Sequence, residues 1–241
     1  QKSKFLKPLA SGLKLGAYSL SEPQSGSDAS NMKTFAEKNG NNFIVNGTKN
    51  WVTSGENSDL IIFFCKTEKG AGSKGISAFI VEKGTPGLTT GKKEEKLGIR
   101  ASDTCELYFD NCEIPESNLI GNLGQGFSIA MQALGGGRIG IASQSVGLAR
   151  AALDKTISYS QEREQFGQVI SKFGAIQNKI ADMATNVEAA RLLVMQAATL
   201  KDQGKDYIKE SSMAKLFASS MAMSAATDCV QVHGGYGYMQ E

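Results

Sequence analysis

The apolar residues follow two different patterns along the chain, and the pattern changes near residue 122. Before that point they form short runs, at 15–20, 43–45, 60–65, 76–81 and 106–109. Segments rich in Gly, Asn and Pro separate the runs, and we expect tight turns at 39–42, 46–47, 68–70 and 85–87. The first half, residues 1–122, is therefore predicted to be an antiparallel β domain, a sandwich or barrel.

The second half has the composition and the residue spacing of long helices. From Gly126 onward Gly, Ala, Leu, Met and Gln dominate, and no proline occurs after Pro115. Apolar residues recur at helical spacing on one face, which predicts amphipathic helices. The stripes are Ile176, Ile180, Met183, Val187 and Ala190, then Met213, Leu216, Phe217, Met221 and Ala225, while 148–155 continues a further helix. Residues 123–241 are expected to form an antiparallel helical bundle. The predicted fold class is therefore α+β, with a β-barrel-like domain followed by the bundle.

Composition excludes several classes of protein. The net charge is only +2, so nothing indicates a nucleic-acid surface, and no apolar run is long enough to predict a membrane span. Four scattered cysteines and one histidine do not predict a metal site, and they favour a reducing compartment, bacterial cytoplasm or mitochondrial matrix. The start at Gln1 is neither a signal peptide nor an initiator Met, so we expect Gln1 to be an interior residue of a longer chain.

The segment from Tyr18 to Asp28, YSLSEPQSGSD, is the richest in chemistry. Its glycine and small hydroxyl residues can turn backbone N–H groups toward an anion such as a phosphate. A polar β-turn capped by Asp28 explains the same residues. The loop by itself leaves both interpretations open.

Four more segments extend the picture in order along the chain. They are NGTKNWVTS at 46–54, KEEKLGIRAS at 93–102, EREQFG at 162–167 and QVHGGYGY at 231–238. Together with the loop at 18–28, they resemble the signatures of the acyl-CoA dehydrogenase family. The run GRIGIASQ at 137–144 is most similar to the short-chain and short-branched-chain members.

The resemblance implies a flavoenzyme that binds FAD and removes an α proton and a β hydride from an acyl-CoA. In the first half, Ser21 and the backbone at Leu20 would stabilise the reduced flavin, Thr53 would lie near the flavin N5 and Trp51 would cover the rings. Gly26 and Ser27 would hold the pyrophosphate. The implied cofactor-binding residues of this half are Tyr18, Leu20, Ser21, Gly26, Ser27, Trp51 and Thr53.

In the second half, the family pattern implies residues that reach the FAD of a neighbouring subunit. These are Arg163, Gln165, Phe166, Gln231, Gly234 and Gly235. A cofactor shared between chains implies a homo-oligomer, most simply a tetramer. An electron-transferring flavoprotein would accept the electrons, and Ser27, Gly135 and Arg138 would contact the acyl-CoA.

Three positions depart from the family pattern. Gly135 stands where relatives carry Asp or Asn, and Gly174 stands where they carry Gln. The usual base is a Glu in a Tyr-Glu-Gly segment, which we expect beyond Glu241, and the minority position for that base holds Gly137. No catalytic residue is therefore assigned within the chain, and residues 1–241 alone are expected to be inactive. An oxidase-like relative, or a member that binds FAD or acyl-CoA without turnover, stays an alternative.

Two features imitate other sites. Residues 135–140 satisfy G-x-G-x-x-G, but the segment before them has a helical pattern, whereas a dinucleotide fold needs a strand there. The only histidine, His233, is expected to be structural.

Overall fold

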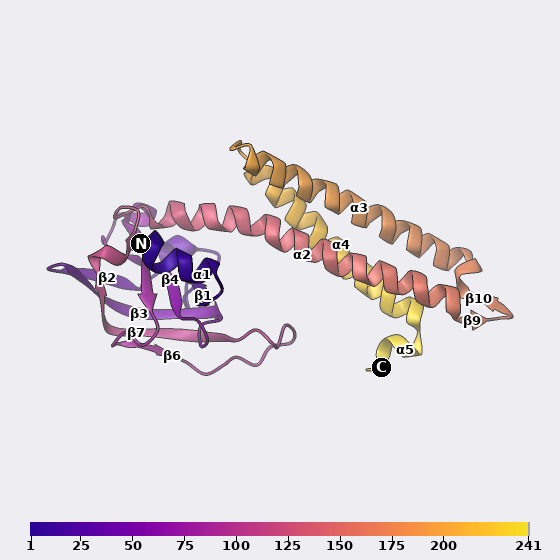
Figure 1. The fold of residues 1–241 in the computed structure, drawn as a ribbon, viewed down its shortest axis with the longest axis horizontal. Helices are drawn as coiled ribbons and strands as arrows, with labels where there is room; N and C mark the ends of the chain where they lie inside the picture. The colour runs from indigo at the N-terminus through magenta and orange to yellow at the C-terminus, as the bar shows by residue number, and fades with distance from the viewer. Residues whose placement is uncertain (241) are drawn as a thin grey trace. The chain divides into compact units, whose positions relative to one another are not determined.

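The computed structural model describes residues 1–240, and the chain divides into two compact units, Gln1–Met131 and Gln132–Glu241 (Figure 1). The long helix α2 (Gly126–Glu162) belongs partly to each unit. A boundary between residues 122 and 123 stays a prediction.

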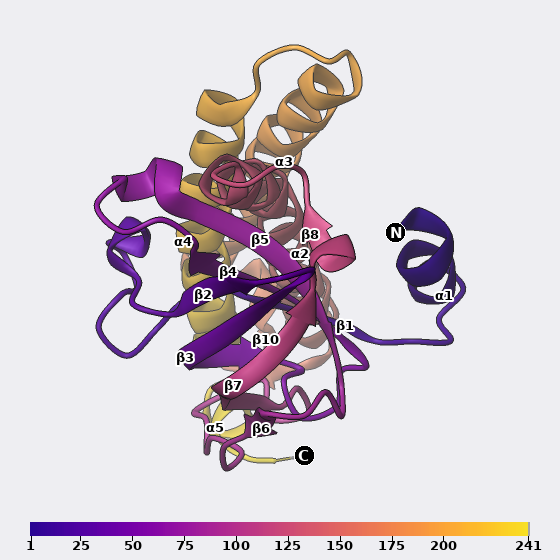
Figure 2. The same cartoon turned by 90° about the vertical axis from the view of Figure 1, so that its left-hand side faces the viewer.

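The first unit is built on one mixed sheet of eight strands, which fan out in Figure 2. The strands are β1 (Gly16–Ser19), β2 (Phe35–Asn39), β3 (Asn42–Thr53), β4 (Leu60–Lys66), β5 (Ile76–Glu82), β6 (Leu88–Thr90), β7 (Thr104–Pro115) and β8 (Leu119–Ile120). Their order is β6-β7-β3-β2-β4-β5-β8, and β1 pairs with β4.

The sheet corrects two details of the predicted β domain. The pairs β1–β4 and β2–β4 are parallel. The β2–β3 hairpin supplies the crossover between β1 and β4, and β3 alone supplies the crossover between β2 and β4. The end strands β6 and β8 do not pair with each other within the described residues, so these strands form no closed barrel.

The turn predicted at Asn46–Gly47 is wrong. Both residues lie inside β3, where the pairing register with β7 shifts between Val45 and Gly47. Gly47 has φ +149°, and a Cβ there would lie 2.4 Å from the Thr34 Oγ1. The glycine therefore permits a β-bulge that passes close to Thr34. The turn predicted at 39–42 is confirmed, with Gly40 in the two-residue hairpin loop between β2 and β3.

Both faces of the central strands are covered, which explains why strand β4 is apolar almost throughout. Phe63 and Cys65 pack with Phe43 and Phe109 on one face. Phe64 packs on the other face with Met32 and with the first turns of α2, including Ala130. A short helical segment at the start, Lys2–Leu6 and α1 (Lys7–Ala10), adds Phe5 against Leu60 and Ile80.

The second unit confirms the predicted bundle. It contains the rest of α2, then α3 (Gly174–Asp202) and α4 (Ile208–His233), followed by the short α5 (Gly235–Tyr238). A small hairpin of β9 (Glu164–Gln165) and β10 (Gln168–Val169) joins α2 to α3. Alanines form much of the core, and their small side chains let the helices pack closely. No helix in residues 1–240 is long and apolar enough to cross a membrane.

Candidate functional site

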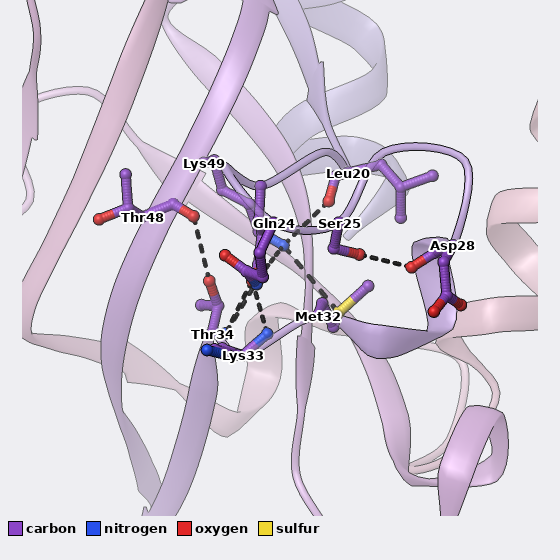
Figure 3. A network of polar contacts seen from close by, with 10 residues as sticks. Leu20, Gln24, Ser25, Asp28, Met32, Lys33, Thr34, Thr48 and Lys49 are labelled. Atoms are coloured by element: carbon purple, nitrogen blue, oxygen red, sulfur yellow. Dashed lines mark hydrogen bonds and ion pairs between the residues drawn. The ribbon is translucent and has the colours of Figure 1, made fainter.

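A buried ion pair organises the loop that follows β1 (Figure 3). Glu22 and Lys49 have side chains that are 2% and 0% exposed, and their charged atoms lie 2.7 Å apart. The Glu22 carboxylate also accepts hydrogen bonds from the backbone N–H groups of Lys33 at 2.5 Å and Thr34 at 3.1 Å, and from the Gln24 amide at 2.7 Å. Glu22 therefore fixes the far end of the loop, where it returns to β2.

The surroundings keep Glu22 ionised. Burial raises the pKa of Glu22, but Lys49 and hydrogen bonds from Lys33 and Thr34 lower it more, so the pKa lies below its usual value. Burial lowers the pKa of Lys49, and the Glu22 carboxylate opposes that shift. A carboxyl group that receives four donors has no place for a proton of its own, so the geometry also requires the anion.

The backbone at Trp51 is strained, and the side chain lies at the surface. The register between β3 and β7 shifts between Lys49 and Val52, so Asn50 and Trp51 together oppose one residue of β7. Trp51 has φ +59°, which is rare for a bulky residue, and it is 63% exposed. Strain of this kind concentrates at functional sites, because the surrounding structure must enforce it. The bulge thus presents the only indole of the chain to a ligand.

The loop and the bulge are joined by a backbone hydrogen bond. The N–H of Asn50 donates to the carbonyl of Ser21 at 2.8 Å, which brings Ser21 beside the Trp51 bulge. Two buried polar atoms here, the Ser19 hydroxyl and the Asn50 side-chain oxygen, have no hydrogen-bond partner within the described residues. Thr53 is exposed two residues beyond Trp51. An exposed aromatic ring, a free hydroxyl and unpaired polar atoms therefore lie along one stretch of the sheet.

Two of the predicted residues turn their side chains into the core. Tyr18 packs on Phe64 with ring centroids 5.1 Å apart, and Leu20 belongs to the same apolar cluster. Burial raises the pKa of Tyr18 to about 12, so its phenol stays neutral. Both residues are half-buried. Gly26 and Ser27 are exposed, and a Cβ at Gly26 would meet nothing within 4 Å.

The second unit brings four predicted residues together. Arg163, Gln165, Gly234 and Gly235 line one pocket of about 530 Å³. The remaining lining residues are Tyr159, Ile170, Val232, His233, Tyr236 and Met239. The Arg163 guanidinium lies 5.9 Å from the centre of the Tyr236 ring. Tyr159 was not among the predicted residues, because it is one polar residue on a long helix and no motif includes it.

The other two residues of this unit that were predicted to bind FAD do not line the pocket. Phe166 lies at the tip of the β9–β10 hairpin and is 94% exposed. It has φ +53° and is followed by Gly167 with φ +74°, both values typical of a two-residue hairpin turn. Gln231 is exposed on α4. Both side chains are accessible to another molecule.

His233 has the contacts of a structural residue. Its ring stacks on Tyr159 with centroids 4.2 Å apart, and its Nδ1 lies 2.8 Å from the carbonyl of Cys229, one turn earlier in α4. The Tyr159 hydroxyl donates to the His233 carbonyl at 3.3 Å. These contacts fix the C-terminal end of α4, and they therefore also fix the position of Gly234, the next residue.

The glycines of α2 differ in what surrounds them. A Cβ at Gly135 would lie 2.7 Å from the Ile208 Cδ1, so the missing side chain leaves room for Ile208. A Cβ at Gly137 would meet nothing within 4 Å. Arg138, the other predicted acyl-CoA contact here, is half-buried.

The geometry around Trp51 suits a planar ligand with a polar edge. The exposed indole provides a stacking face, and Ser21 and Thr53 provide polar groups beside it. These residues fit a flavin, the cofactor that the sequence resemblance implies.

The comparisons give the family. Residues 17–112 match the acyl-CoA dehydrogenase middle domain, and residues 124–241 match the acyl-CoA dehydrogenase C-terminal domain. The chain belongs to the acyl-CoA dehydrogenase family.

Individual relatives are similar along the whole chain. An acyl-CoA dehydrogenase of Bacillus subtilis is 53% identical over 100% of this chain and 64% of its own length. The structure of butyryl-CoA dehydrogenase from Megasphaera elsdenii matches with a TM-score of 0.97 and 48% identity, over 99% of this chain and 62% of that one.

A third match is a chain in a structure described as the electron transferring flavoprotein of Acidaminococcus fermentans. It has a TM-score of 0.97 and 52% identity, over 99% of this chain and 63% of that one. This chain therefore spans less than two thirds of the length of these relatives.

Proposed function

We propose that the protein is an FAD-dependent acyl-CoA dehydrogenase that converts a short or short-branched acyl-CoA to its 2-enoyl-CoA. The observation that carries the proposal is the Trp51 bulge, in which backbone strain presents an indole beside Ser21 and Thr53. Similarity to the butyryl-CoA dehydrogenase of Megasphaera elsdenii supports a short acyl chain.

Each residue near the bulge has a proposed role. Trp51 would cover one face of the flavin rings, and the Thr53 hydroxyl would lie near N5. The Ser21 N–H and hydroxyl would donate to the pyrimidine edge, since neither makes a hydrogen bond within the described residues. Bound FAD would accept the hydride from the β carbon of the thioester. Donors fixed at the pyrimidine edge stabilise the negative charge that reduction creates there.

The proposal assigns proton abstraction to none of the carboxylates in residues 1–240. Glu22 is the carboxylate nearest to Ser21 in the sequence, but it is 3% exposed and engaged by four donors. A base must be free to take a proton and within reach of the substrate. Glu22 meets neither requirement and is instead a structural anion of the loop.

The pocket of the second unit is proposed to hold part of a neighbouring subunit's FAD. Arg163 supplies a cation for a phosphate, and the exposed Gly234 and Gly235 allow a close approach of the ligand. Exposed Phe166 and Gln231 are proposed to reach that neighbour. Gly135 and Arg138 are proposed to contact the acyl-CoA, together with Ser27. A homotetramer in bacterial cytoplasm or mitochondrial matrix completes the proposal, with an electron-transferring flavoprotein as the acceptor.

The test is reduction of the bound flavin. The full-length protein, loaded with FAD and mixed with butyryl-CoA without oxygen, should lose its visible absorbance and form crotonyl-CoA. Slow reoxidation by oxygen and fast reoxidation by an electron-transferring flavoprotein support a dehydrogenase, and fast reoxidation by oxygen indicates an oxidase-like relative. Bound FAD that no acyl-CoA reduces would indicate a binding protein without turnover. A protein that takes up no FAD would refute the proposal.

A further inference from the structure

We propose that the buried Lys49 is a positioning residue that tunes the flavin, because its ammonium group strengthens the Ser21 N–H as a hydrogen-bond donor through the Leu20–Ser21 peptide group. The inference rests on the proposed function and deepens it, since Lys49 touches neither the cofactor nor the substrate.

The ammonium of Lys49 is directed at the loop from beneath it (Figure 3). Its Nζ donates to the Glu22 carboxylate at 2.7 Å and to the carbonyl oxygen of Leu20 at 3.1 Å, and it lies 4.0 Å from the Met32 sulfur. The side chain is fully buried, so water does not screen the charge. The ammonium therefore acts at short range on one peptide carbonyl, although the Glu22 carboxylate offsets part of its field.

The carbonyl of Leu20 and the N–H of Ser21 belong to the same peptide group. In a trans peptide these two groups point in opposite directions, and the chain contains no cis peptide bond within the described residues. The Ser21 N–H thus points away from Lys49 and has no partner within residues 1–240. An ammonium on the carbonyl oxygen polarises the whole group, because hydrogen bonds in a chain strengthen one another. The result is a more acidic, better oriented donor at Ser21.

Lys49 also couples the loop to the Trp51 bulge. The residue after Lys49 is Asn50, whose N–H donates to the Ser21 carbonyl at 2.8 Å. The peptide groups on both sides of Ser21 are therefore held by two successive residues of β3. One buried side chain sets both the strength of the donor and its place relative to the indole.

Stability alone does not account for this ion pair. A buried pair of charges is often no more stabilising than apolar residues of the same volume. The Glu22 anion caps the loop, whereas the contact of Lys49 with the Leu20 carbonyl adds a function that an apolar side chain lacks. Removal of the ammonium should make the reduced flavin less stable and lower the midpoint potential of the bound FAD.

The experiment compares wild type with the double variant Glu22→Gln/Lys49→Met in FAD-loaded full-length protein. The double variant removes the ion pair as a whole, so it leaves neither a buried carboxylate nor a buried ammonium without its counter-charge. The midpoint potential is measured by equilibration with a redox dye. The double variant should have a flavin reduction equilibrium at least about tenfold less favourable, or about 30 mV for a two-electron couple. Glu22→Gln/Lys49→Gln repeats the comparison with a polar, uncharged side chain in case the methionine prevents folding.

Lys38→Met serves as the control. Lys38 forms an exposed ion pair with Glu116 at 2.8 Å in the same unit, and its loss should leave the potential unchanged. Equal potentials in wild type and in the double variants, all loaded with FAD, would overturn the inference and leave the proposed function intact. A wild-type protein that takes up no FAD would refute the proposed function itself.

Discussion

Replacement of Trp51 by Gly should weaken FAD binding much more than it weakens the fold. Trp51 is 63% exposed, so roughly a third of the 150–250 Å² that an aromatic side chain can bury is at stake, or about 1–2 kcal/mol. Glycine adopts φ +59° without the steric penalty of about 1–2 kcal/mol that other residues meet there. In the protein without cofactor, the lost apolar burial and the relieved backbone strain nearly cancel, so the free energy of unfolding should change little.

The loss of FAD affinity is not compensated in this way. Stacking of an aromatic ring on a base-like ring system contributes about 1–3 kcal/mol, which corresponds to a roughly 5–150-fold rise in the dissociation constant. Trp51→Ala, which keeps the backbone penalty, should show the same loss of affinity together with a lower free energy of unfolding.

The assay is a titration followed through FAD fluorescence, with unfolding in urea measured separately. Trp51 is the only tryptophan, so its own emission should also fall when wild-type protein binds FAD. Equal FAD affinity in wild type and both variants would refute the assignment of Trp51 as the cover of the flavin.

Three further results are expected. Arg163→Ala should lower FAD occupancy, and light scattering of the flavin-loaded wild type should give a tetramer; a fully loaded monomer would contradict this. Because the pKa of folded Glu22 lies below its usual value of about 4.3, its contribution to stability is complete above that pH and is lost as the pH falls through the folded pKa. Urea unfolding between about pH 6 and about pH 3 should therefore show a smaller loss in Glu22→Gln than in wild type, and equal losses would contradict the assignment. Gly137→Ala should raise the free energy of unfolding by about 0.5–1 kcal/mol, whereas Gly135→Ala should gain less, because its Cβ would lie 2.7 Å from Ile208; thermal unfolding of both tests this.

The elements that local pattern specifies were predictable. The runs at 60–65 and 76–81 became β4 and β5 because continuous apolar residues suit strands covered on both faces. The apolar stripes of α3 and α4 were equally clear. The turn predicted at Asn46–Gly47 was wrong because the same dipeptide suits both a turn and a β-bulge. Only the proximity of Thr34 decides between the two.

The candidate site was predictable as a set of motifs but not as geometry. The sequence indicated that Ser21 and Trp51 belong to one site, and a hydrogen bond from Asn50 to Ser21 joins their segments. It did not reveal that Lys49 lies beneath the loop, because a lysine in a strand is usually exposed. The pairing of Glu22 with Lys49 spans 27 positions and depends on how β1 and β3 approach each other.

The alanine-rich core of the second unit has a consequence for the pocket at its end. Ala149 of α2 and Ala225 of α4 belong to the core, and Tyr159 and His233 lie on the same two helices at the pocket, about 12–15 Å further along. The closest approach of two helices depends on the size of the side chains between them. The alanine methyl groups of that core therefore contribute to the width of the pocket, although Ala149 and Ala225 do not line it. A larger residue at Ala149 or Ala225 would alter the spacing of Tyr159 and Val232 without changing any residue that lines the pocket. Variation in ligand affinity among related chains should therefore be sought along the helix interior as well as at the pocket itself.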